Sequence, residues 1–274
     1  MSSGPIHTPT HPNAPGTTAR EPLLCVENVS VQFGGLRAVD QFNFTHGQDE
    51  LLGLIGPNGA GKTTAFNVVT GVYQPTSGDV KLAGASIAGL PPFQINRAGI
   101  ARTFQNIRLF GGLTVLENVL VGFTQSVTHG FLGTVLRTPR HQREDNHHDA
   151  EAMQLLSTLH LADKADLPAG SLPYGDQRRL EIARALATRP KVLLLDEPAA
   201  GMNPQEKSDL MGLIRFIREQ FKVGIWLIEH DMKLVMSICE RITVLDHGET
   251  IAVGSASAVQ CDPKVIEAYL GEPV

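Results

Sequence analysis

Residues 56–64 have the sequence Gly-Pro-Asn-Gly-Ala-Gly-Lys-Thr-Thr, which fits the pattern G-x-x-x-x-G-K-[ST] of a loop that binds phosphate groups. Its glycines let the backbone curl so that N–H groups point inward around an anion, and Lys62 adds a positive charge over the outer phosphates. The hydroxyl of Thr63 can bind Mg²⁺, and a helix that begins near Lys62 directs the positive end of its dipole at the anion. The pattern therefore predicts a nucleoside triphosphate site formed by Gly56, Pro57, Asn58, Gly59, Ala60, Gly61, Lys62, Thr63 and Thr64.

Two adjacent carboxylates, Asp196 and Glu197, follow the apolar run 192–195. A buried strand that ends in two acids delivers them to the edge of the sheet where a phosphate loop also lies. In phosphoryl transfer one acid can hold Mg²⁺, while the other polarises a water molecule for in-line attack on the γ-phosphate. We expect Asp196 to hold the metal ion and Glu197 to act as the general base.

Short apolar runs alternate with helical patterns from Pro22 onward. Buried strands of a parallel sheet are apolar along their whole length, and helices cover such a sheet. The alternation predicts an α/β fold with the phosphate loop at the carboxyl end of a strand, and it places Trp226 in the core. We predict strands over residues 24–31, 42–44, 51–55, 192–195, 225–228 and 242–245, an edge strand over 79–82, and helices over about 62–71 and 204–220.

Two stretches depart from this alternation. Residues 1–20 are rich in Pro, Thr, Ser, Gly and His and have almost no apolar periodicity, so we expect a disordered tail. Residues 105–186 have the pattern of helical segments joined by polar connections, which predicts a helical insertion into the sheet domain.

The histidines and cysteines are not spaced like metal ligands. His7 and His11 lie in the tail, while His141, His147 and His148 lie among charged residues typical of a solvated helix face. The three cysteines are odd in number and widely spaced, which predicts reduced thiols rather than disulfides or a zinc site. We interpret all three as packing residues: Cys25, Cys239 and Cys261.

Charge and hydropathy limit the partners of the chain. Its 274 residues have a net charge of −5, which provides no basic field for nucleic acid or for an anionic membrane surface. No apolar stretch reaches the roughly 18 residues needed to span a bilayer, and the N-terminus lacks the apolar core of a secretory signal. We therefore expect a soluble chain that stays inside the cell and reaches a membrane only through a protein partner.

Several motifs, in a fixed order from Pro22 to the C-terminus, resemble those of the nucleotide-binding subunits of ABC transporters. Residues 103–105 resemble the Q-loop, 171–180 the signature region, 199–203 the D-loop and 228–231 the H-loop. Phe33, which precedes Gly34-Gly35, matches the aromatic position that stacks on adenine in this family.

The resemblance implies a fold and a division of the chain. The fold is a P-loop NTPase core, with a mostly parallel sheet, an antiparallel β subdomain and an inserted helical subdomain. The ABC ATPase domain then covers residues 21–274, with its core at 21–104 and 187–254, its helical subdomain at 105–186 and a C-terminal segment at 255–274.

The resemblance also implies ATP and Mg²⁺ as the bound groups, and a role for each motif residue. Gln105 would reach Mg²⁺ or the attacking water, and His230 would contact the γ-phosphate. The catalytic set is then Glu197, His230 and Gln105, and the metal ligands are Thr63, Gln105 and Asp196. A second nucleotide-binding subunit completes each site through its signature residues, which in this chain are Pro173, Tyr174, Gly175 and Asp176.

Besides Tyr174, which a subgroup of the family already tolerates, two signature residues differ from the usual sequence L-S-G-G-Q of the family. Pro173 replaces a serine that donates its hydroxyl to the γ-phosphate, although proline is acceptable in the first turn of a helix. Asp176 replaces a glutamine, and its carboxylate would be repelled by a triphosphate unless it points away or meets Arg178 or Arg179. We therefore expect weaker ATP-driven dimerisation.

Within the family, residues 181–188, 196–204, 229–236 and 265–272 resemble the ATP-binding subunits of branched-chain amino acid importers. This resemblance implies leucine, isoleucine, valine or related amino acids as cargo. It also implies membrane permease subunits, an identical or homologous second ATPase, a substrate-binding protein that acts indirectly, and a location at the cytoplasmic face of the inner membrane. The sequence leaves the cargo and the composition of the dimer open.

Two alternatives remain. A non-transport ABC ATPase usually has two cassettes or a long coiled-coil insertion, and this chain has neither. A nucleotide-sensing module with low turnover is suggested by Pro173 and Asp176, but Glu197 and His230 favour an active enzyme.

Overall fold

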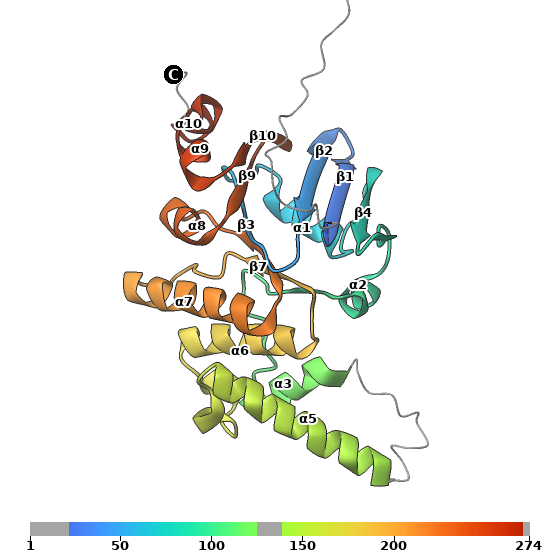
Figure 1. The fold of residues 1–274 in the computed structure, drawn as a ribbon, viewed down its shortest axis with the longest axis vertical. Helices are drawn as coiled ribbons and strands as arrows, with labels where there is room; N and C mark the ends of the chain where they lie inside the picture. The colour runs from blue at the N-terminus through green and yellow to red at the C-terminus, as the bar shows by residue number, and fades with distance from the viewer. Residues whose placement is uncertain (1–21, 125–138, 271–274) are drawn as a thin grey trace, which may run out of the picture.

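The structure is a computed structural model that describes residues 22–124 and 139–270, including side chains except those of residues 139–146. The predicted tail with His7 and His11 lies outside the described residues, as does the side chain of His141. Two sheets lie at one end of the molecule and the inserted helices at the other (Figure 1).

The first sheet is four-stranded, with the order β2-β1-β4-β5. It contains β1 (Leu24–Phe33), β2 (Leu36–His46), β4 (Ser77–Leu82) and β5 (Ala85–Ser86), all paired antiparallel. This is the antiparallel β part that the family resemblance implies. The prediction that residues 79–82 form an edge strand is wrong, because β5 pairs with β4; a two-residue strand has no detectable pattern.

The second sheet is six-stranded, with the order β10-β9-β3-β8-β7-β6. Only the β10–β9 pair is antiparallel. Every residue of β3, β7 and β8 is buried, which explains their uninterrupted apolar sequences. The strands are β3 (Leu51–Ile55), β6 (Ile100–Arg102), β7 (Val192–Asp196), β8 (Gly224–Ile228), β9 (Arg241–Asp246) and β10 (Glu249–Gly254).

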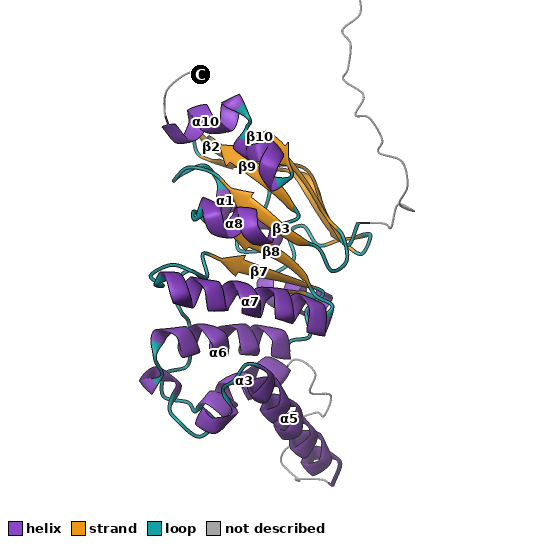
Figure 2. Ribbon diagram, turned by 60° about the vertical axis from the view of Figure 1, so that its left-hand side comes forward, coloured by secondary structure: helices purple, strands orange, loops and turns teal. Residues whose placement is uncertain are grey.

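Helices cover this sheet and extend away from it. In Figure 2, α7 lies beside the sheet, α6 lies beyond α7, and α3 and α5 lie farthest from the strands. The α/β class with inserted helices is therefore confirmed. The helices are α1 (Lys62–Val69), α2 (Pro92–Ala98), α3 (Val115–Phe123), α5 (Pro139–Thr158), α6 (Tyr174–Ala187), α7 (Pro204–Phe221), α8 (Met232–Ile238), α9 (Ala256–Gln260) and α10 (Pro263–Leu270), with 3₁₀ turns η2 (Ala162–Lys164) and η3 (Ala169–Ser171).

Capping residues fix where the helices near the candidate site begin. Asn203 accepts a hydrogen bond from the backbone N–H of Glu206, whose side chain accepts one from the N–H of Asn203. Asp231 caps α8 by accepting from the N–H of Leu234. Because such caps satisfy N–H groups that the first turn leaves unpaired, α7 and α8 begin immediately after the D-loop and H-loop segments.

Trp226 lies in the core, as predicted. It is fully buried and stacks on Phe44 with ring centroids 4.0 Å apart, and Phe66 from α1 packs against the same ring at 4.7 Å. This aromatic cluster joins the two sheets to α1, and it therefore supports the helix that follows the phosphate loop.

The burial of the cysteines and histidines agrees only in part with the predictions. The three cysteines are free, but Cys261 is exposed and does not pack, in contrast to buried Cys239. His147 is exposed, whereas His148 is half-buried with its ring stacked on Phe123 at 5.4 Å, so the solvated-face interpretation is wrong for His148. Within residues 22–124 and 139–270 no helix is long and apolar enough to cross a membrane, and no group of His, Cys, Asp or Glu is arranged to hold a metal ion.

Candidate functional site

The phosphate loop joins the carboxyl end of β3 to the start of α1, as the sequence predicts. Two of its glycines are required by close backbone contacts. A Cβ atom on Gly56 would lie 2.0 Å from the carbonyl oxygen of Leu245, and one on Gly61 would lie 2.5 Å from that of Ala38. Gly61 also has a φ of 100°, a backbone conformation that residues with a side chain rarely adopt. The loop therefore lies tightly between β9 and β2.

Lys62 fills the centre of this loop. Its ammonium group donates to the carbonyl oxygens of Gly56 at 2.7 Å and Pro57 at 2.8 Å. Burial lowers the pKa of Lys62, and the nearby carboxylates of Glu197 and Asp196 oppose that shift. A partly desolvated cation held only by neutral oxygens is suited to bind an anion, so the cradle fits a phosphate group.

A cavity of about 520 Å³ opens beside the loop. It is lined by residues 59–64 and by Phe33, which is half-exposed and packs edge-on against Tyr73 with centroids 5.1 Å apart. Four lining residues were not predicted, because they lie in two hairpins without a sequence motif: Leu36, Arg37, Ala38 and His247.

Gln105, Glu197 and His230 converge from three separate segments. The amide nitrogen of Gln105 donates to Glu197 Oε2 at 3.0 Å, and His230 Nδ1 lies 3.4 Å from the same oxygen. Glu197 has a φ of 44°, a conformation uncommon outside glycine that tends to occur at functional sites. The structure thus brings the three residues of the predicted catalytic set together.

Asp196 has a different environment from Glu197. Its Oδ2 accepts a hydrogen bond from Arg102 at 2.6 Å, and both side chains are nearly buried. Arg102 also donates to Asn67 on α1 at 2.7 Å and to Thr70, the residue that ends this helix, at 3.3 Å. Sequence analysis missed Arg102 because the three-residue strand β6 that positions it has no recognisable pattern.

Oxygen donors suited to a hard cation remain at this point. Asp196 Oδ1 accepts no hydrogen bond from the described part of the chain, and Thr63 is exposed at the start of α1. The side chain of Gln105 adds an amide oxygen near Glu197. Carboxylate, hydroxyl and amide oxygens are the donors that Mg²⁺ prefers, so this set fits the ion.

Glu229 is a buried acid that the sequence analysis did not assign. Its Oε1 accepts the backbone N–H of Ala199 at 2.8 Å, and its Oε2 accepts that of His230 at 3.3 Å. Burial raises the pKa of this carboxyl above its ordinary value. Glu229 therefore links the H-loop to the start of the D-loop from beneath the site.

The signature residues Pro173, Tyr174, Gly175 and Asp176 lie at the start of α6 and do not line the nucleotide cavity. Asp176 pairs with Lys164 at 2.6 Å, a cation other than Arg178 and Arg179, the two that the sequence suggested as partners. Lys164 lies on the 3₁₀ turn η2, which sequence patterns do not place near α6.

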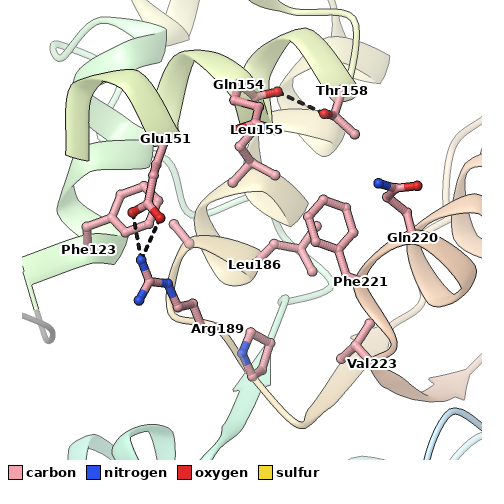
Figure 3. A pocket seen from close by; sticks show the side chains of 12 residues that line it. Phe123, Glu151, Gln154, Leu155, Thr158, Leu186, Arg189, Gln220, Phe221 and Val223 are labelled. Carbon is pink, nitrogen blue, oxygen red and sulfur yellow. Dashed lines mark hydrogen bonds and ion pairs between the residues drawn. The ribbon is translucent and has the colours of Figure 1, made fainter. Parts of the chain in front are cut away.

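A separate cavity of about 380 Å³ lies where α3, α5, α6 and α7 approach one another (Figure 3). Arg189 binds both carboxylate oxygens of Glu151 at its rim, at 2.7 and 2.6 Å, and Phe221 faces it from the other side. None of the predicted site residues lines this cavity, so it is distinct from the nucleotide site.

Two families match the sequence. The family described as "ABC transporter" matches residues 39–200, and the family described as "Branched-chain amino acid ATP-binding cassette transporter" matches residues 249–274. The first of these covers more than half of the chain and includes the phosphate loop, the Q-loop and the two carboxylates.

Curated relatives align along most of the chain. The high-affinity branched-chain amino acid transport ATP-binding protein BraF of Pseudomonas aeruginosa is 47% identical over 92% of this chain and 98% of its own length. The corresponding protein LivG of Escherichia coli (strain K12) is 47% identical over 92% of this chain and 99% of its own length.

Solved structures share the fold. A nucleotide-free ATP-binding cassette from an ABC transporter superposes with a TM-score of 0.79 at 31% identity and covers 92% of this chain and 100% of its own. The ADP conformation of an ATP-binding cassette gives the same TM-score at 30% identity, with the same coverage.

Proposed function

The chain belongs to the ABC transporter family, and from this premise we propose that its ATPase activity drives import of branched-chain or related amino acids through separate permease subunits. Support for the cargo comes from BraF and LivG, which are similar to this chain over nearly their whole lengths. The match of residues 249–274 to a branched-chain amino acid transporter family favours an importer over a non-transport ABC ATPase.

The observation that supports hydrolysis best is the convergence of Gln105 and His230 on Glu197. We assign Glu197 as the general base, because its carboxylate is partly exposed beside the phosphate loop and is not held by a cation such as the one that pairs with Asp196. We assign His230 to contact with the γ-phosphate and the Gln105 amide to orientation of the attacking water. A full catalytic set argues against a module that only senses nucleotide.

Residues of the loop and the neighbouring cavity would bind ATP. The backbone N–H groups of the loop residues other than Pro57 and the ammonium of Lys62 hold the phosphates, and Phe33 stacks on adenine. Thr63, Gln105 and Asp196 would hold Mg²⁺, which neutralises charge on the phosphate oxygens when bound. Arg102 orients Asp196 by fixing one of its two carboxylate oxygens.

A second subunit is needed to complete the site. Pro173, Tyr174, Gly175 and Asp176 belong to α6 and lie away from the nucleotide cavity of their own chain. We infer that they face the nucleotide of an identical or homologous partner ATPase, and that the pair works at the cytoplasmic face of the membrane. The substrate-binding protein would act only through the permeases.

The permease contact is assigned to a groove of about 530 Å³ next to the Q-loop. Arg108 and Arg184 line it, and Phe110 is half-exposed beneath the guanidinium of Arg184. A permease segment with apolar and acidic side chains would complement this surface, and it would lie within a few residues of Gln105.

Transport by the assembled complex tests the proposal. The chain is reconstituted in vesicles with permease subunits and a binding protein of the branched-chain amino acid type, and uptake of radiolabelled leucine, isoleucine and valine is measured with and without ATP. Lys62→Ala serves as the matched control, because it removes the cation of the loop and leaves the permease surface intact. ATP hydrolysis without uptake of any of these amino acids would contradict the assigned cargo.

A further inference from the structure

Three side chains on one face of α6 connect this helix to the Q-loop and to the D-loop. Tyr174, Arg178 and Glu181 are spaced at i, i+4 and i+7, which places them on one side of the helix. Arg178 and Glu181 are buried and form an ion pair at 2.7 Å. We call these three residues the α6 clamp.

The ion pair of the clamp binds the backbone on both sides of the Gln105 side chain. Arg178 donates to the carbonyl oxygens of Phe104 at 2.7 Å and Gln105 at 2.9 Å. Glu181 Oε1 accepts the N–H groups of Phe104 and Arg108, both at 3.3 Å. Four backbone groups of residues 104–108, in the Q-loop and just after it, are therefore fixed by one buried pair.

The clamp also contacts the segment that follows the carboxylate of Glu197. The hydroxyl of Tyr174 donates to the carbonyl oxygen of Ala200 at 3.0 Å, and Arg178 donates to the same hydroxyl at 3.4 Å. The N–H of Ala200 in turn donates to the carbonyl oxygen of Glu197 at 3.2 Å. Both partners of the Gln105–Glu197 hydrogen bond are thus connected to α6.

A buried ion pair contributes little net stability, because the cost of desolvating two charges offsets their attraction. The hydrogen bonds of this pair go mainly to the loop that bears Gln105 rather than to the helical core. An arginine suits that task, since its planar fork can bind two carbonyl groups at once, whereas the compact lysine ammonium cannot do so in the same geometry.

We propose that Arg178 is a positioning residue for ATP hydrolysis, which sets the Gln105 side chain against Glu197 and links its position to the start of α6. The proposal rests on the roles assigned above to Gln105 and Glu197. Because Tyr174 belongs to the signature segment, a shift of that segment would be passed through Arg178 to the Q-loop. The same helix would then both face the partner subunit and adjust the site of its own chain.

Arg178→Lys tests this role, because it keeps a cation beside Glu181 but loses the simultaneous hydrogen bonds to the carbonyl oxygens of Phe104 and Gln105. In the assembled transporter, kcat for ATP should fall about tenfold, while KM changes by less than about twofold, as expected when a catalytic group is misplaced without loss of binding. Arg179→Lys is the matched control, since the neighbouring Arg179 has no hydrogen bond to residues 103–108 of the described chain.

A double-mutant cycle distinguishes positioning from a general structural effect. If Arg178 acts through Gln105, then Arg178→Lys should change kcat by less than about twofold in a Gln105→Ala background. Independent, multiplying effects of the two substitutions would overturn the proposal. Absence of hydrolysis in the wild-type complex would instead contradict the proposed ATPase assignment, so the two failures are distinguishable.

A second measurement decides the question when turnover of Gln105→Ala is too low for the cycle. The side-chain amide resonance of Gln105 is followed by NMR in the nucleotide-free chain, with Gln105→Ala used for its assignment. Arg178→Lys should move this resonance toward that of a solvated glutamine, and Tyr174→Phe should move it in the same direction by a smaller amount. An unchanged resonance in Arg178→Lys would overturn the proposal.

Discussion

Asp196 and Glu197 are adjacent in sequence, but the structure gives them opposite surroundings. Asp196 is nearly buried and held by Arg102, whereas Glu197 is partly exposed and faces Gln105 and His230. A carboxylate with one oxygen fixed and the other available is suited to bind a cation, while a partly exposed carboxylate that no Arg or Lys holds remains available to activate water. The division of roles inferred from the sequence therefore has a physical basis in these two environments.

Glu197→Gln should separate binding from turnover. The amide keeps the size and hydrogen bonds of the side chain but cannot accept a proton, so ATP affinity should be retained while hydrolysis falls by about two to four powers of ten. Nucleotide binding by fluorescence and phosphate release in the complex measure the two effects. Hydrolysis at the wild-type rate would show that Glu197 is not the base.

Glu229→Gln should change stability in a pH-dependent way. Burial raises the pKa of Glu229, so the folded state binds its proton more tightly than the unfolded state does. The stability that it contributes is present below the ordinary value of 4.5 and is lost as the pH rises through the raised value. The melting temperature of Glu229→Gln relative to wild type should therefore increase from pH 4 to pH 8, because the amide still accepts the N–H of Ala199. Glu219→Gln, at an exposed position, should show no such trend.

At the scale of elements, strands with a long apolar run were predictable and very short ones were not. The boundaries of β3 were predicted correctly, because a five-residue apolar run between polar turns has no competing interpretation. Strand β6 has three residues and β10 is only partly buried, so neither shows the pattern of a buried strand. The consequence for the site is that Arg102, which ends β6, was missed although its partner Asp196 was predicted.

The start of α6 shows how a tertiary contact changes the interpretation of a motif residue. Asp176 lies in the first turn of α6, where a negative charge interacts favourably with the helix dipole, and it also pairs with Lys164. The sequence could not indicate this pair, because η2 is brought to α6 by the packing of the inserted helices. The repulsion expected from Asp176 is therefore reduced by a cation within its own chain.

Asp176→Asn should lower stability slightly. Loss of the ion pair and of the charge at the helix start should cost about 1 kcal/mol or less, because solvent screens a partly exposed pair. Urea unfolding of the two proteins measures the difference, with Asp209→Asn on the exposed face of α7 as the control. A larger loss for the control than for Asp176→Asn would contradict the importance of this contact.

The whole molecule presents the two parts of the proposed site on separate surfaces. The phosphate loop, Asp196 and Glu197 lie at the carboxyl ends of the parallel strands, whereas the signature residues begin a helix of the inserted part. Family membership and the overall fold follow from motifs along the chain, but the relation between these surfaces depends on how the helices pack. Under the proposed function, a complete site requires the association of two subunits, and mutations can be chosen that affect only that step.

Gly175→Asp is such a mutation. A Cβ atom on Gly175 would meet nothing within 4 Å, so the folded chain can accept a side chain there, and its melting temperature and ATP affinity should remain close to those of wild type. If the signature segment faces the nucleotide of the partner, the added carboxylate lies against phosphate groups, and ATP-dependent association and hydrolysis should fall by at least about tenfold. Gly212→Asp is the matched control, because Gly212 lies in α7 with equally open space around its Cα. Sedimentation in ATP and phosphate release test both variants, and wild-type association and turnover in Gly175→Asp would show that the start of α6 does not form the second half of the site.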